Sequence, residues 1–156
     1  GVVLEETADI LKKYTIPGMK VLQQRIPNNK VHDEIHPKHW DFNIAAYTGT
    51  HDSPTVKQWL NEVEDVQLQF FNDYKKDTKS QFGSDIWNFI SLVWESPCQL
   101  AITTIQDLLE LDKEARFNLP GTQEGNWKWR IQDFADLKKP LNILKEINNV
   151  NERISD

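Results

Sequence analysis

The sequence has a single cysteine, a shortage of basic residues and no long apolar run. One cysteine in 156 residues excludes an intrachain disulfide framework and a zinc site made of several cysteines. A formal net charge of -6 argues against nucleic acid as a partner, because phosphate binding needs a basic face. We find neither a run of about 18 apolar residues nor a signal-peptide pattern, so we expect a soluble, cytoplasmic protein with no membrane partner.

The residues that are present suffice for one modest folded domain. Hydrophobic residues make up 38% of the chain, and six residues are tryptophan. This composition is too apolar and too aromatic for a disordered segment. We therefore expect residues 1–156 to belong to a single domain.

Three short apolar runs are predicted to be strands, at residues 19–24, 42–48 and 100–105. Helical patterns lie between them, and this alternation is typical of βαβ units in a parallel sheet. The third run, LAITTI, is continuously apolar, as buried parallel strands tend to be. Because three such strands would leave apolar edges unpaired, the pattern indicates part of a larger α/β fold. A barrel of eight strands, for comparison, needs about 250 residues.

The predicted helices have recognisable starts and buried residues. One begins at Ser53-Pro54-Thr55, because serine is a good N-cap and proline is tolerated at the first helical position. Its buried side is expected to carry Val56, Trp59 and Leu60. A helix that begins at Ser84 is expected to bury one face, made of Ile86, Trp87, Ile90, Val93 and Trp94. Further helices are expected through Tyr14 and near 139–154.

His51 and Asp52 lie in the segment TGTHDSPT, between a predicted strand and a predicted helix. In parallel α/β folds, functional groups gather at the C-terminal ends of strands. Asp52 can accept hydrogen bonds from ligand hydroxyls, and His51 can donate one to a sugar or phosphate oxygen. The residues leave a structural alternative open, in which Asp52 helps Ser53 to cap the helix and His51 is an ordinary loop histidine.

A metal site is a second interpretation of this doublet. Metal-dependent phosphohydrolases can use adjacent histidine and aspartate as ligands, and His32, His36 and His39 precede the doublet at helical spacing. Pro37 interrupts that segment, however, so loop histidines are favoured. We expect neither a metal nor a cofactor.

The segment EARFNLPGTQEGNWKWR, residues 114–130, is predicted to be a turning loop. Its asparagines, arginines and tryptophans are the mixture found in carbohydrate sites, where aromatic rings contact sugar C–H faces and amides bind hydroxyls. Alternatively, Trp127 and Trp129 seal the side of a core and the arginines pair with nearby carboxylates.

Four segments together resemble the amylomaltases, or 4-alpha-glucanotransferases: IPGMKVLQ at 16–23, YTGTHDSPT at 47–55, LAITTIQDLLEL at 100–111 and the loop at 114–130. The resemblance implies an α/β fold, the C-terminal part of a (β/α)8 TIM barrel with about its last three strands and their helices. It implies retaining transfer of α-1,4-glucan segments between maltodextrins and sugar acceptors, without a cofactor. A non-catalytic α-glucan-binding module is the alternative.

The resemblance also implies roles for individual residues. Asp52 and His51 match a supporting carboxylate and histidine that hold sugar hydroxyls, and Asn118 matches a candidate sugar contact. The family's nucleophile lies upstream, and its acid/base glutamate belongs to a Glu-Asp-Leu-Gly motif whose last glycine resembles Gly1. We therefore expect this chain to be a C-terminal fragment that is inactive alone.

Overall fold

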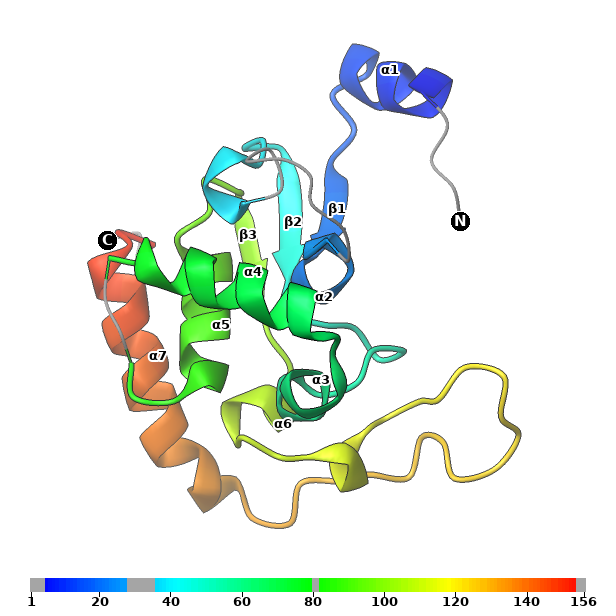
Figure 1. Ribbon diagram of the computed structural model, residues 1–156, viewed down its shortest axis with the longest axis vertical. Helices are drawn as coiled ribbons and strands as arrows, with labels where there is room; N and C mark the ends of the chain where they lie inside the picture. The colour runs from blue at the N-terminus through cyan, green and yellow to red at the C-terminus, as the bar shows by residue number, and fades with distance from the viewer. Residues whose placement is uncertain (1–4, 28–35, 80–81, 154–156) are drawn as a thin grey trace.

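A parallel sheet of three strands organises the fold (Figure 1). The structure is a computed structural model that describes residues 5–27, 36–79 and 82–153. Its strands are β1 (Gly18–Val21), β2 (Ile44–Tyr47) and β3 (Leu100–Ile102), in that order. The register places Ala46 beside Lys20 on one side and Ala101 on the other. The predicted α/β class and parallel pairing are confirmed.

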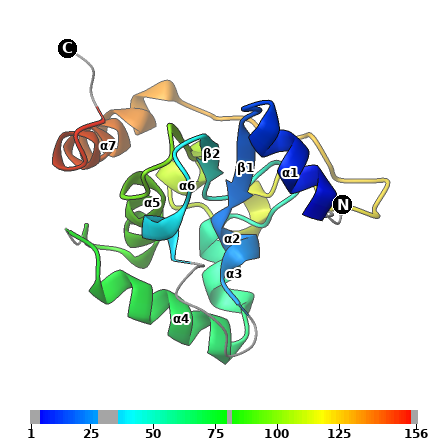
Figure 2. The ribbon, with the colours of Figure 1, turned by 90° about the horizontal axis from the view of Figure 1, so that it is seen from above.

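Helices fill the connections between the strands. The α1 helix (Glu5–Lys13) precedes β1 and projects away from the other elements in Figure 1; seen from above in Figure 2, it lies on the β1 side of the molecule, away from α7. Between β2 and β3 lie α3 (Val56–Glu62), α4 (Asp65–Lys76) and α5 (Asp85–Trp94), and α7 (Lys138–Val150) ends the described chain. Short 3-10 turns occupy Pro37–His39, Lys113–Ala115 and Phe134–Leu137. Within the described ranges, no helix has the length and apolar character needed to cross a membrane.

All three predicted strands are shorter in the structure: the one expected at 42–48 spans Ile44–Tyr47, and the other two give way to a helical turn. The strand expected at 19–24 ends at Val21, and α2 (Leu22–Arg25) follows it. The strand expected at 100–105 ends at Ile102, and α6 (Ile105–Leu108) begins after the N-cap Thr104. The Thr104 hydroxyl accepts a hydrogen bond from Asp107 N, which fixes the start of α6.

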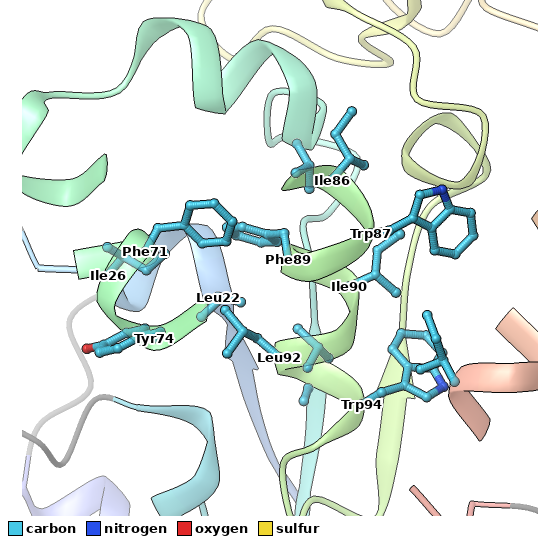
Figure 3. Packing of buried hydrophobic residues seen from close by; sticks show 14 of the residues in the cluster. Leu22, Ile26, Phe71, Tyr74, Ile86, Trp87, Phe89, Ile90, Leu92 and Trp94 are labelled. Carbon is cyan, nitrogen blue, oxygen red and sulfur yellow. The ribbon is translucent and has the colours of Figure 1, made fainter. Parts of the chain in front are cut away.

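The α5 helix is the centre of the core (Figure 3). The sequence predicted one buried face, but every residue from Ile86 to Trp94 is buried. The reason is tertiary: α5 packs against the sheet, α4 and α7, so its polar residues are enclosed as well. Phe89 lies 5.3 Å from Trp59 and 5.5 Å from Phe71, measured between ring centroids. Burial of such a ring contributes about 2 kcal/mol.

The opposite face of the sheet carries apolar side chains that the described residues leave exposed. Met19, Ala45 and Leu100 are register neighbours in one row across the three strands. Met19 is 58% exposed and Leu100 is 55% exposed. The expectation that the third strand is fully buried is therefore wrong for this chain, because the helices cover only one face.

Candidate functional site

The segment that carries His51 and Asp52 runs from the C-terminal end of β2 to the start of α3. Within it, the Ser53 hydroxyl accepts a hydrogen bond from Thr50 N at 3.0 Å and closes a tight turn. The sequence predicted Ser53 as the N-cap of α3, and this prediction is wrong. Thr55 is the cap: its hydroxyl accepts from Gln58 N at 3.2 Å, and the helix begins at Val56.

A close approach at Gly49 places this turn against α2, the helical turn that follows β1. The buried Gln23 side chain donates from Nε2 to Pro54 O at 3.1 Å. A β-carbon added to Gly49 would lie 3.0 Å from Gln23 Nε2 and 3.2 Å from Ser53 Cβ. Glycine is favoured here for space, because a β-carbon would push the Gln23 amide or the Ser53 side chain aside by a few tenths of an ångström.

Three residues predicted from the sequence come together at the exposed side of the turn. His51 Nε2 lies 3.2 Å from Asp52 Oδ2, and the two side chains are 57% and 49% exposed. Asn118 donates from Nδ2 to Asp52 Oδ1 at 2.5 Å. The site therefore combines a carboxylate, an imidazole and an amide, all of which can bind hydroxyl groups.

Arg116 ties the turn to the 114–130 loop, a role that the sequence did not indicate. Its Nη2 donates to Asp52 O at 2.9 Å, and its Nε donates to Asn118 O at 3.0 Å. The guanidinium thus bonds the backbone on both sides of the Asn118–Asp52 contact. The expected pairing of this arginine with a nearby carboxylate side chain is replaced by bonds to two carbonyls.

Aromatic rings form one wall of the site. Trp127 lies 5.3 Å from the His51 ring and meets Phe117 edge-on at 4.9 Å, measured between centroids. Trp127 is 52% exposed, so the interpretation that it seals a core is wrong. Trp129 is partly buried and lines a cavity of about 300 Å³, together with His51 and Arg116. The rings thus stand beside the polar groups.

The tip of the 114–130 loop is held by its own hydrogen bonds. Asn126 Oδ1 accepts from Leu119 N at 2.8 Å, and its Nδ2 donates to Thr122 O at 3.1 Å. Gly121 and Gly125 have positive φ angles of 82° and 85°, which the turn requires. The Asn126 amide therefore serves the loop, whereas the Asn118 amide serves the site.

The histidines preceding the site do not form a metal centre in the described residues. His36 is buried, its ring centroid lies 4.6 Å from that of Tyr74, and its Nδ1 accepts from Lys38 N at 3.1 Å. His39 is exposed, and His32 lies outside the described residues. In the ranges that the structure describes, no group of three or more His, Cys, Asp or Glu side chains can hold a metal ion. His51 and Asp52 also lie in a turn, not in the helix that a His-Asp phosphohydrolase would require.

Comparisons with known proteins agree on one family. A family model for 4-alpha-glucanotransferase matches residues 1–137. The chain is 35% identical to the 4-alpha-glucanotransferase of Streptococcus pneumoniae, over 100% of this chain and 30% of that protein. It is 32% identical to the chloroplastic/amyloplastic enzyme of rice, Oryza sativa subsp. japonica, over 99% of this chain and 26% of the relative.

A solved structure gives the same result for the fold. The amylomaltase from Streptococcus agalactiae, solved in complex with acarbose, superposes with a TM-score of 0.87 at 26% identity. The alignment covers 99% of this chain and 31% of that one. The chain thus spans less than a third of the length of these relatives.

Proposed function

Because this chain belongs to the 4-alpha-glucanotransferase family, we propose that it supplies the substrate-holding part of an active site for retaining transfer of α-1,4-glucan segments. The observation that carries this proposal is the position of Asp52. Its carboxylate lies at the C-terminal end of a parallel strand, between His51 and the Asn118 amide. Active sites of (β/α)8 barrels lie at this end of their strands.

We also propose that β1, β2 and β3 are adjacent strands of a (β/α)8 barrel. Two features of the sheet support this assignment. Consecutive strands are parallel neighbours, and helices cover one face while Met19, Ala45 and Leu100 are left on the other. In a barrel, that open face would point inward and be covered by side chains from other strands.

In this proposal Asp52 binds the sugar and performs neither covalent step. Retaining transfer needs one carboxylate as nucleophile and another as acid/base, and we expect both outside these 156 residues. Asp52 accepts hydrogen bonds from hydroxyls of the sugar at the reacting carbon. These bonds strengthen as the ring flattens toward the oxocarbenium-like transition state, so they lower the barrier.

The neighbours of Asp52 keep it in place and extend the contact. The Asn118 side-chain nitrogen Nδ2 donates to Asp52, so the side-chain oxygen Oδ1 is left to accept from a second sugar hydroxyl. His51 contacts the other carboxylate oxygen through Nε2, and its second ring nitrogen, Nδ1, can accept a hydrogen bond from a sugar hydroxyl. The Streptococcus agalactiae amylomaltase is described in complex with acarbose, and we expect the present site to contribute to binding of the same compound.

Disproportionation of maltotriose tests the proposed function. The natural-length protein that carries this chain should convert maltotriose into glucose and longer maltodextrins, whereas the 156 residues alone should not. Transfer by the isolated 156 residues would show that the nucleophile lies among them and would contradict the proposal. Binding without transfer by the natural-length protein would favour a non-catalytic glucan-binding module.

A further inference from the structure

A buried carboxylate lies behind the exposed site, and no pattern in the sequence indicated its role. Asp107, on α6, is only 1% exposed. Its Oδ1 accepts a hydrogen bond from Val56 N at 2.7 Å, and its Oδ2 accepts from Thr48 Oγ1 at 2.8 Å. The hydroxyl of Thr48 also lies 3.1 Å from that of Thr103.

Two of the hydrogen-bond partners of Asp107, Thr48 and Val56, mark the two ends of the segment that carries the site. Thr48 directly follows β2, and Val56 is the first residue of α3. His51 and Asp52 lie between them. A single side chain from the following βα unit therefore bonds both the entry and the exit of this segment.

The strength of this connection follows from its surroundings. Burial raises the pKa of the Asp107 carboxyl, while the hydrogen bonds from Val56 and Thr48 lower it. Hydrogen bonds to a carboxylate are shorter and stronger than neutral ones, especially away from water. By contrast, the Thr50–Ser53 hydrogen bonds are local, Gln23 bonds the segment at Pro54 O, and the bonds of Asp52 to Asn118 and Arg116 are exposed to solvent.

We infer that Asp107 is a positioning residue for His51 and Asp52, because its carboxylate fixes both ends of segment 48–56. This inference rests on the proposed function for its catalytic consequence, but not for its structural one. Loss of the carboxylate lets the two ends move apart, and the Asp52 oxygens leave the position that the sugar hydroxyls require. A displacement of about 1 Å at such a group can lower a rate by up to about 100-fold.

Three variants of the natural-length protein that carries this chain separate the effect of the two Asp107 hydrogen bonds, to Thr48 and Val56, from a general loss of stability. Asp107→Leu removes both acceptors. Asp107→Asn is the conservative variant, because its oxygen still accepts from Val56 N and its amide can donate to Thr48 Oγ1. Ile147→Ala is the matched control, since Ile147 is fully buried on α7, away from segment 48–56.

The first readout is amide hydrogen exchange, which requires no enzymatic activity. Asp107→Leu should accelerate exchange at Val56 and Ser53 by about tenfold or more relative to Ile147→Ala at equal global stability. Unchanged exchange at these amides overturns the inference, whatever the protein catalyses. If Asp107→Leu does not fold, Thr48→Val removes the hydrogen bond from Thr48 to Asp107 and should likewise accelerate amide exchange in this segment.

The second readout is steady-state transfer from maltotriose, expressed per folded molecule. We expect kcat to fall by about tenfold or more in Asp107→Leu with KM changed by less than about twofold, and Asp107→Asn to recover most of the rate. Equal kcat values in Asp107→Leu and Ile147→Ala would overturn the inference. Inactivity of the parent protein would contradict the proposed function. The exchange result would then decide by itself whether Asp107 fixes segment 48–56.

Discussion

Acidification from pH 7 to pH 5 should destabilise the fold through one buried histidine, His36. Its imidazole packs against Tyr74 and is 7% exposed. Burial, together with the positive charge of Lys38, lowers the pKa of His36 from 6.5 to about 4. Asp77 acts in the opposite direction but does not offset burial. The folded protein therefore holds this imidazole neutral at pH values where the unfolded chain has bound a proton.

The sign and size of the effect follow from this difference in pKa. A folded-state pKa below the unfolded one means that stability is complete above pH 6.5 and is lost as the pH falls toward 4. One pKa unit corresponds to about 1.4 kcal/mol, so His36 should remove about 2 kcal/mol between pH 7 and pH 5. The loss should reach about 3 kcal/mol below pH 4.

Urea unfolding at pH 7 and pH 5, followed by tryptophan fluorescence, measures this loss. His36→Gln carries no titratable ring, so its stability should decline by about 2 kcal/mol less over the same interval. His39→Gln is the matched control, because His39 is exposed three residues away; it should decline like the parent. Equal declines in the parent and in His36→Gln would refute the reasoning.

Three further predictions concern the site and its support. Asn118→Ala removes the donor to Asp52 and should lower kcat/KM for maltotriose transfer about tenfold, with Asn118→Asp at least as damaging because two carboxylates then face each other; unchanged kinetics would contradict this. Gly49→Ala places a methyl group 3.0 Å from Gln23 Nε2 and should lower the free energy of unfolding in urea by about 1 kcal/mol. An unchanged free energy of unfolding would contradict this. Arg153 donates to three carbonyls near the end of α5, so Arg153→Gln should cost about 2 kcal/mol in the same assay, and full stability would show that water replaces those bonds.

Local patterns in the sequence predicted the class of fold, because strand and helix periods reflect neighbouring residues. The complete burial of α5 was not predictable in this way, since it depends on packing against α4 and α7 from other parts of the chain. The helix start at residues 53–55 shows the same limit at small scale. Both Ser53 and Thr55 can cap a helix, and the choice was decided by the Thr50 N–H, which engages the serine.

The site itself was predictable to the extent that its residues are close in sequence. His51 and Asp52 were found from their position after a strand. Asn118 lies 66 residues from Asp52, and only the family resemblance connected the two. Asp107 was missed because its partners lie 51 and 59 residues away and a buried aspartate has no pattern of its own.

The central claim is that Asp52 holds the reacting sugar in a retaining glucanotransferase. The most direct test is kcat/KM for maltotriose disproportionation by the natural-length protein and its Asp52→Asn variant. If the carboxylate stabilises the transition state by several kcal/mol, the variant should lose on the order of 100-fold or more while remaining folded. A folded Asp52→Asn protein that transfers glucan at the parent rate would contradict the claim.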